Sequence, residues 1–425
     1  MRPSRSRQLS GLAVSAALAL GGSLTAAQAQ DKITLTFVNW ASAEAATRPG
    51  IEKVIAAFEA AHPDIEIRSE AVSFSEIARQ LVLRIRSGNP PDVAQIAGND
   101  TILVAATGGL EPLGSYVEDG TREALKPAAL SGLEVAGELI ALPWNLAPAG
   151  FWYNKAIMEQ AGLDPESPPA TIDELMAAMA AIKQSQPDVI PLGLDTTNRA
   201  FALSSNWPWM LAFGAVPIGE DGTGAASQAM KDYLAWMREL AQRNYIDPGR
   251  KSGEFRPLAA QDKVAFHWDQ VLLQGVIQSV NGMADEAFYE RFGVTTQPAG
   301  PSGESYSFEG GHQLVMFADV EHKDAAWAFM KYLATAPDAI ENYTVSYNAS
   351  LPPLAEPPES IAGQLDTPVF NAFQDDIIPT IAAQPYGPEF ATAATAIMAG
   401  VQEAVTGERP IDEIAATIDQ QLKAR

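Results

Sequence analysis

Apolar and polar positions near the N-terminus follow a rhythm that predicts alternating strands and helices. A strand is predicted at residues 33–38, where Ile33, Leu35 and Phe37 occupy every second position. A helix is predicted next, because apolar side chains recur at three- and four-residue intervals over 51–58. The pattern continues with a strand at 65–67, a helix at 77–85 and a buried strand at 93–97. This order predicts parallel strands joined by right-handed crossovers.

The same rhythm returns later in the chain. Residues 151–153 read as a strand, and a capping box from Thr171 to Glu174 begins a predicted helix. A second buried strand is predicted at 190–194 and another helix at 323–334. The chain has 425 residues, and a domain usually has about 100–200. Two α/β lobes are therefore expected.

The first 29 residues have the pattern of a secretory signal peptide. Three arginines precede an uncharged apolar run at 9–24, and Ala27-Gln28-Ala29 matches a small-x-small cleavage site. A transmembrane anchor is the alternative, but the run is short and rich in Ala, Gly and Ser. We expect a periplasmic protein, with the signal peptide removed near Ala29.

Composition narrows the classes of partner. Asp and Glu number 52 against 28 Lys and Arg, so the net charge is −24. Such a balance argues against binding to nucleic acid or to an anionic membrane surface. The chain has no cysteine, which excludes disulfides, thiolate metal sites and a lipidated N-terminal cysteine.

Four blocks of sequence carry a family resemblance. They are SGNPPD at 87–92, GELIALPWNLAPAGFWYNK at 137–155, the Glu-Gly-Gly that begins at Glu309, and residues 390–422. In this order and spacing they resemble family 1 extracellular solute-binding proteins of ABC sugar importers, the group that includes maltose-binding protein. The resemblance covers nearly all of residues 31–425.

The resemblance implies a periplasmic-binding-protein fold of the type II kind, an α/β fold. Each of its two lobes would be a mostly parallel sheet flanked by helices, with the ligand cleft at the hinge. Crossovers would fall near Trp144–Asn145, near Phe308–Gly310 and somewhere after Ser350. The first lobe would then be 31–143 plus about 309–350, and the second 144–308 plus about 351–425. Open α/β sheets bind ligands beyond the carboxyl ends of their strands.

A sugar site needs planar hydrogen-bonding groups beside aromatic side chains, and such mixtures occur where predicted strands end. The candidate ligand-binding residues are Asn39, Trp40, Asn99, Asp100, Trp144, Asn145, Asn198, Trp207, Trp268, Asp269, Glu309, Gly311, His312 and Tyr347. Several have a structural alternative. Trp207 and Trp268 could belong to the core, and His312 could be a satisfied structural histidine. Asp269 stands where the family usually has a small residue, which leaves its role open.

Several catalytic chemistries lack their motifs. The four histidines show no metal-ligand spacing, and neither GxSxG nor a P-loop motif occurs. We therefore predict no cofactor, no metal and no enzymatic activity. The expected function is a monomeric receptor that captures a sugar or polyol, closes its lobes around it and delivers it to the permease subunits of an ABC importer.

Two other functions stay open. The ligand could be a phosphorylated or sulfonated sugar derivative, with Arg48, Arg199 or His312 neutralising the anionic group. A secreted glycoside-active enzyme is the alternative of another class. Two carboxylates about 5–10 Å apart around a bound sugar would favour it.

Overall fold

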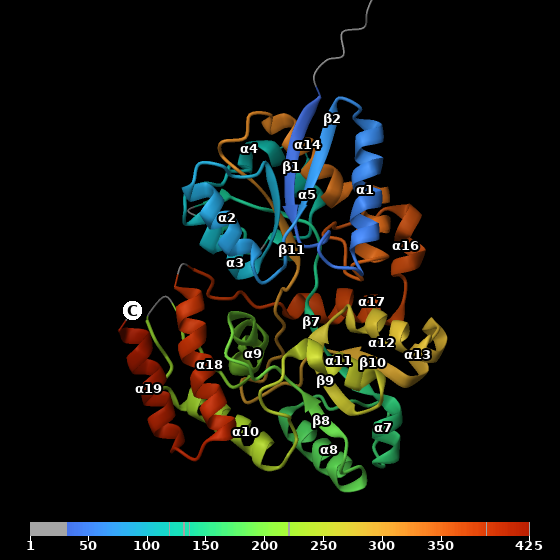
Figure 1. The fold of residues 1–425 in the computed structure, drawn as a ribbon. Coiled ribbons are helices and arrows are strands. Elements are labelled where there is room, and N and C mark those ends of the chain that lie inside the picture. Colours follow the sequence, from blue (N-terminus) through green and yellow to red (C-terminus); the bar gives the residue numbers. More distant parts are fainter. Residues whose placement is uncertain are drawn as a thin grey trace, which may run out of the picture.

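The computed structural model describes residues 32–424, apart from residues 119, 131, 136, 220, 221 and 388 and the side chain of Asn99. The predicted signal peptide at 1–29 lies outside the described residues. Two mixed sheets lie one above the other, each with its own helices (Figure 1). Among the described residues, no helix is long and apolar enough to cross a lipid bilayer.

The first sheet has five strands in the order β2-β1-β3-β11-β6. Their bounds are β1 (Ile33–Asn39), β2 (Ile65–Ala71), β3 (Val93–Ala97), β6 (Leu142–Pro143) and β11 (His312–Met316). The strand β1 is parallel to both β2 and β3, which confirms the predicted parallel pairing. The strand β11 is antiparallel to β3 and β6, and its first residue His312 pairs with Ala97 at the end of β3.

Helices and short elements cover the first sheet. They are α1 (Arg48–Ala61), α2 (Ile77–Arg86), α3 (Gly98–Ala105), α4 (Gly114–Val117), α5 (Thr121–Ala124), α6 (Pro127–Leu130), α14 (Lys323–Thr335), α15 (Pro337–Ala339), the π-helix η1 (Ile340–Val345) and α16 (Glu359–Leu365), with a small ribbon of β4 (Glu134–Val135) and β5 (Glu138–Leu139). In α1, a proline occupies the first turn, and the predicted stripe of Ile51, Val54, Ile55 and Phe58 is buried.

The second sheet has four strands in the order β10-β7-β9-β8. These are β7 (Ala149–Asn154), β8 (Ile190–Gly193), β9 (Val264–Gln270) and β10 (Phe292–Thr295). Only β8 and β9 are parallel, and β7 is antiparallel to both of its neighbours. The α/β fold is confirmed, with this difference from a mostly parallel sheet. The strand β7 starts opposite the end of β9, at Ala149 and Gln270, because the chain enters this sheet from the edge where β9 leaves it.

Helices pack on both faces of the second sheet. They are α7 (Lys155–Gln160), α8 (Ile172–Ser185), α9 (Ala200–Ala212), α10 (Gln228–Gln242), α11 (Ser252–Ala260), α12 (Leu273–Asn281), α13 (Asp285–Arg291), α17 (Pro368–Asn371), α18 (Phe390–Thr406) and α19 (Ile411–Lys423), with the π-helix η2 (Ala372–Ile377) and the 3-10 turn η3 (Ile378–Thr380). The predicted capping box begins α8, since Thr171 and Glu174 cap each other's backbone amides.

Three hydrophobic clusters show where the chain changes sheets. The first surrounds the five-stranded sheet, and the second and third cover the two faces of the four-stranded sheet. Trp144 belongs to the first cluster and Ala149 to the second. Later, Leu354 and Ile361 return to the first cluster, whereas Val369 belongs to the third. Each sheet is therefore completed by segments distant in sequence.

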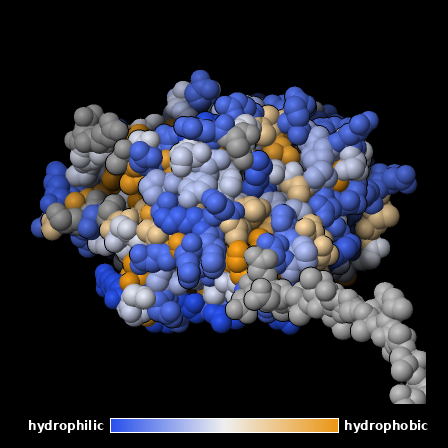
Figure 2. All heavy atoms as spheres, turned by 90° about the horizontal axis from the view of Figure 1, so that it is seen from above, coloured by the Kyte–Doolittle hydropathy of each residue, from blue (hydrophilic) through white to orange (hydrophobic). Residues whose placement is uncertain are grey.

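Apolar side chains are scattered over the outer surface. The face in Figure 2, seen from above the first sheet, is mostly hydrophilic, with small and separated apolar spots. Large apolar side chains that are exposed, such as Leu83 and Val280, lie on different helices. Scattered apolar residues of this kind are ordinary on a soluble surface.

Candidate functional site

A cavity of about 490 Å³ lies between the two sheets, and we call it the cleft cavity. Its volume is in the range of small-molecule sites. Three parts of the chain contribute its walls. The first sheet and its helices and loops contribute Trp40, Glu44, Phe74, Ala97, Gly98, His312 and Asn348. The second sheet and its helices contribute Arg199, Phe201, Ser204, Lys251, Ser252, Gly253, Glu254, Arg256, Gln270 and Leu272. The segments that connect the two halves of the molecule, called the connecting segments, contribute Phe308, Glu309, Gly310, Gly311 and Tyr386.

Glu309 lies on the connecting segment just before β11. Its Oε1 accepts hydrogen bonds from the backbone N–H of Ala147 at 3.0 Å and of Gly311 at 2.5 Å. Its Oε2 is buried and has no hydrogen-bond partner among the residues that the structure describes. Burial raises the pKa of Glu309 to about 7, although the backbone amides oppose this shift. Glu309 thus lines the cleft cavity and has a buried carboxyl oxygen that lacks a donor within the described part of the chain.

The two residues after Glu309 are glycines, and neighbouring atoms leave little space for a Cβ at either position. A Cβ on Gly310 would lie 2.3 Å from the Nε2 of Gln270, and one on Gly311 would lie 2.1 Å from the backbone oxygen of Asn145. The contact at Gly311 is with backbone and excludes a side chain, whereas a side chain at Gly310 would displace the amide of Gln270. The glycines let two connecting segments pass in contact, and this brings Glu309 against Ala147.

His312 presents a defined hydrogen-bond donor to the cleft cavity. Its Nδ1 lies 3.0 Å from Gln95 Nε2 and 3.2 Å from Asn145 Nδ2. Both amide oxygens accept backbone N–H groups, so both amides must turn their donors toward the imidazole. Burial lowers the pKa of His312 to about 3, so the ring is neutral at pH 7. Its hydrogen therefore lies on Nε2.

Aromatic rings flank this histidine. The ring of Trp40 meets the His312 ring edge-on, with centroids 4.8 Å apart, and meets Phe74 at 5.2 Å. Phe201 and Phe308 form a second aromatic contact across the cavity wall, at 5.8 Å. Aromatic plates beside hydrogen-bonding groups suit a ligand that has both C–H faces and hydroxyl edges.

Basic side chains on the opposite wall are held by buried carboxylates. Arg256 binds Asp269 through Nε at 2.7 Å and Nη2 at 2.9 Å. Burial would raise the pKa of Asp269, but the Arg256 charge outweighs it and the pKa is lowered. Arg199 binds the buried Asp195 at 2.6 Å. Both guanidinium groups are therefore partly neutralised before any ligand binds.

Four of the predicted site residues line the cleft cavity: Trp40, Glu309, Gly311 and His312. Three more stand behind the wall and hold other groups in place. Asn145 orients His312, Asp269 orients Arg256, and Asn39 accepts the backbone N–H of Ser42 at 2.7 Å, close to Trp40. Side chains of this kind position the site without touching a ligand.

The three other predicted tryptophans lie in the core, and this corrects the expectation that they face the ligand. Trp144 is fully buried, stacks on Tyr343 at 4.4 Å and donates to the carbonyl of Leu333 at 3.1 Å. Trp268 and Trp207 are also buried, and their indole N–H groups bind the carbonyls of Ser205 and Ala383. Apolar surface and a satisfied donor make these positions stable inside a lobe.

Three more predicted residues, Asn198, Asp100 and Tyr347, are not among the described residues that line the cavity. Asn198 is exposed in the turn before α9, and Asp100 lies in the first turn of α3. Asn99 is in the same helix, but its side chain is outside what the structure describes. The ring of Tyr347 packs against Gly50, and its neighbour Asn348 lines the cavity instead.

Several lining residues were not singled out in the sequence, among them Glu44, Phe74, Gln270, Arg256 and Tyr386. Nothing in the local pattern around Arg256 or Tyr386 separates them from other surface positions. Gln270 had a weak signal, because it ends a buried strand. Its Nε2 donates to the carbonyls of Ala147 and Gly310, so it ties the second sheet to both connecting segments.

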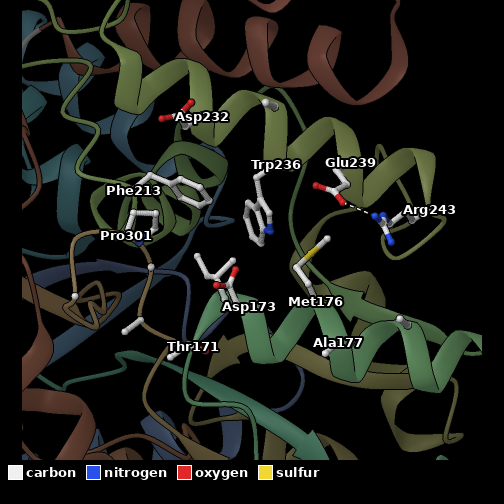
Figure 3. Close-up of a pocket in the computed structure, with 16 residues that line it drawn as sticks. Thr171, Asp173, Met176, Ala177, Phe213, Asp232, Trp236, Glu239, Arg243 and Pro301 are labelled. Carbon is white, nitrogen blue, oxygen red and sulfur yellow. Dashed lines mark ion pairs between the residues drawn. The ribbon is translucent and has the colours of Figure 1, made fainter.

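A larger hollow of about 1020 Å³ lies elsewhere, between α8 and α10 and the loop at 299–303 (Figure 3). Trp236 stands at its centre between Phe213 and Met176. On the rim, Glu239 and Arg243 form an ion pair at 2.8 Å. Both helices belong to the part of the molecule built around the second sheet, and they lie on its side away from the first sheet (Figure 1). This open groove joins no residue of the connecting segments, so the cleft cavity is the better candidate site.

The described part of the chain does not assemble a set of metal ligands. Within 32–424, leaving aside the undescribed positions, no group of three or more His, Asp or Glu side chains is arranged to hold a metal ion.

Arg48, which the sequence suggested as a partner for an anionic group of the ligand, donates to the carbonyls of Ser42 and Ala43. It does not line the cleft cavity, whereas Arg199 does.

Comparison with known proteins relates this chain to bacterial binding proteins. Residues 41–340 match the family described as bacterial extracellular solute-binding protein. A Brucella abortus relative named only as a candidate binding protein is 27% identical over 298 residues, covering 68% of this chain and 69% of its own. The sn-glycerol-3-phosphate-binding periplasmic protein UgpB of the same species is 28% identical over 250 residues, covering 54% and 56%.

Solved structures show the same fold. An ABC transporter solute-binding protein from Thermotoga lettingae, bound with alpha-D-tagatose, aligns with a TM-score of 0.76 at 21% identity. The alignment covers 92% of this chain and all of that one. At this identity the likeness concerns the fold.

Proposed function

Because this chain belongs to the bacterial extracellular solute-binding protein family, we propose that it captures a sugar or polyol and delivers it to an ABC importer. The observation that carries this proposal is a cavity lined by three residues: Glu309, whose buried Oε2 has no partner among the described residues, the neutral His312 and Trp40. A carboxyl acceptor, a neutral donor and an aromatic plate match the hydroxyl edges and C–H faces of a sugar. The tagatose-bound relative supports the same ligand class.

The proposed mechanism is closure of two lobes around the ligand. The first lobe is 31–143 with a second segment from about 309, and the hydrophobic clusters favour ending that segment between Ile361 and Val369 rather than near 350. Since Trp40 and His312 belong to one lobe and Arg256 to the other, a ligand that touches both stabilises the closed state.

Export, partners and the absence of catalysis belong to the same proposal. The family name and the signal-like N-terminus support a periplasmic location after cleavage near Ala29. The permease subunits of the importer would recognise the closed monomer. Neutral His312 and the paired Arg256 suit binding rather than bond cleavage, and no cofactor is required.

A second ligand class has a specific observation in its favour. Arg199, Lys251 and Arg256 all line the cleft cavity, and α9 and α11 begin beside them. Helix N-termini and basic side chains attract anions. The UgpB relative, whose name gives sn-glycerol-3-phosphate as its ligand, points the same way. The pairing of Arg199 with Asp195 and of Arg256 with Asp269 places a neutral sugar ahead of this alternative.

A thermal-shift screen of the mature chain would test the function. Neutral monosaccharides, disaccharides and polyols would be compared with sugar phosphates, sulfonates and free amino acids. We expect at least one neutral sugar to raise the melting temperature, with compaction in solution scattering. Stabilisation only by anionic sugars would favour the second class. Stabilisation by amino acids alone, or release of shortened saccharides during incubation, would contradict the receptor of neutral sugars.

A further inference from the structure

A small chamber of about 50 Å³ lies behind the cleft cavity, and we call it the back chamber. Gly98, Glu309 and Tyr386 line both spaces, so the two adjoin each other. Leu133 and residues 381–384 close the far side. A single water needs about 10–15 Å³ of such volume. The back chamber therefore has room for one small functional group.

Two residues that line the back chamber each have a buried acceptor without a donor among the described residues. The Oε2 of Glu309 and the Oε1 of Gln384 are both buried and unpaired within the described part of the chain. The other half of the Gln384 amide is used, since Nε2 donates to the carbonyl of Ser204 at 3.2 Å. An unpaired buried acceptor costs about 1–3 kcal/mol. Two such acceptors beside one small space indicate that a bound molecule donates hydrogen bonds to them.

The other polar groups of the back chamber are already engaged. Gln313 donates to the carbonyl of Gly311 at 3.2 Å and accepts from Thr101 at 3.2 Å. Tyr386 pairs its hydroxyl with Ser204 at 3.3 Å. Among the residues that the structure describes, the rest of the wall is glycine backbone and the aliphatic side chains of Leu133, Ile381, Ala382 and Ala383. A matching group therefore combines one apolar carbon with a hydrogen-bond donor.

Access to the back chamber passes the contact of Tyr386 with Gly98. A Cβ on Gly98 would lie 3.1 Å from the Tyr386 hydroxyl, so this glycine leaves the space that the tyrosine ring fills. Gly98 begins α3 beside the first sheet, whereas Tyr386 contacts Ser204 of α9 beside the second. Separation of the two lobes would widen this passage, and their closure would trap a group that has entered.

We propose that the back chamber binds the hydroxymethyl group of a hexose unit, with Glu309 and Gln384 as its hydrogen-bonding partners. This inference rests on the proposed sugar-binding function. A hydroxyl both donates and accepts, so it can serve two neighbouring acceptors even when the carboxyl of Glu309 carries a proton. Its CH₂ group matches the aliphatic wall. The same two residues then exclude sugars that leave both acceptors unpaired.

Pairs of hexoses and their 6-deoxy analogues test this directly, because each pair differs by one hydroxyl at nearly constant volume. Glucose, galactose and mannose would be titrated calorimetrically against their 6-deoxy forms; where only a disaccharide binds, its terminal 6-deoxy analogue takes their place. We expect the hexose to bind about tenfold or more tightly than its 6-deoxy partner. A 6-amino-6-deoxy sugar forms a third arm.

Gln384→Met is the informative variant, since it keeps the side-chain length and removes the unpaired acceptor. Gln186→Met is its matched control, because Gln186 also donates to one backbone carbonyl, that of Ile157 at 3.0 Å, but lies outside the cleft. We expect Gln384→Met to reduce the hexose preference to about threefold or less, and Gln186→Met to retain it.

The outcomes separate the two proposals. Equal binding of hexose and 6-deoxy analogue, or an unchanged preference in Gln384→Met, overturns the back chamber assignment while sugar binding stands. Stronger binding of the 6-amino sugar overturns the hydroxymethyl in favour of an ammonium group. No binding of any sugar overturns the proposed function and this inference with it.

Discussion

The side-chain amide of Asn145 contacts His312 at two points: Oδ1 accepts a hydrogen bond from the backbone N–H of His312 at 3.1 Å, and Nδ2 lies 3.2 Å from the imidazole Nδ1. Asn145 lies on a connecting segment, whereas His312 is the first residue of β11, and the two are 167 positions apart. The amide therefore fixes both the position and the tautomer of the histidine. A side chain that holds a hydrogen-bonding group in place without touching the ligand makes such a site more precise.

Substituting Asn145→Leu should weaken ligand binding about tenfold without direct loss of a ligand contact. The imidazole loses one donor to Nδ1, and its ring is no longer held toward the cavity. The ¹⁵N chemical shifts of His312 report the tautomer and should show less Nε2–H form. His62, which stacks on Phe58 away from the cleft, serves as an internal control. Weaker binding with an unchanged His312 spectrum would contradict this role.

Glu309 should make stability depend on pH. Its pKa in the folded state, about 7, is higher than the ordinary 4.5, so folding favours the protonated carboxyl. This contribution is present below pH 4.5 and is lost as pH rises through 7. We expect Glu309→Gln to flatten the fall in the free energy of unfolding across this window.

The control for that experiment is Glu286→Gln, at an exposed position of α13. Denaturant unfolding at several pH values between 4 and 8 gives the comparison. The same pH dependence in Glu309→Gln as in the parent chain would rule out Glu309 as its source.

Trp144 should behave as a core residue. Trp144→Ala removes the stack on Tyr343 and the bond to Leu333, and should destabilise the protein by about 3–5 kcal/mol. Trp144→Phe keeps an aromatic ring in the stack and should cost less. Affinity measured well below the melting temperature should change little in the folded Trp144→Phe protein. A large loss of ligand affinity with unchanged stability would contradict the core role and indicate that Trp144 contacts the ligand.

Trp40 should show the opposite balance. Its ring lines the cleft cavity beside His312, so Trp40→Leu should reduce sugar affinity by roughly tenfold or more. Leucine retains much of the apolar contact with Phe74, which limits the loss of stability. Calorimetric titration beside denaturant unfolding separates the two effects. An unaffected affinity would show that the ligand does not reach this wall.

The pair of Arg256 and Asp269 should be sensitive to loss of one partner. Asp269→Leu leaves the Arg256 guanidinium without its carboxylate in a mostly buried place, and should cost up to about 3 kcal/mol. The double variant Arg256→Met, Asp269→Leu should recover part of this stability. Asp269→Leu should also favour anionic ligands, because it frees a positive charge at the cavity wall. Thermal shifts with sugar phosphates provide the measurement.

The sequence by itself determined the elements and the family. The stripe in α1, the capping box of α8 and the strand predicted at 33–38 were readable because their signals are local: side-chain periodicity and capping depend on neighbours within one turn or one pleat. Trp40, Glu309, Gly311 and His312 were also readable, since they adjoin strand ends or connecting segments that the family resemblance locates.

Tertiary structure alone decided which side of the chain each candidate shows to the cavity. Trp144 sits next to Asn145 at a connecting segment, yet Tyr343, nearly 200 positions later, stacks on its ring and draws it into the core. Arg256 enters the cavity wall because Asp269 of another element holds it there. At such positions the direction of a side chain is set by packing against segments remote in sequence, and no local pattern carries that information.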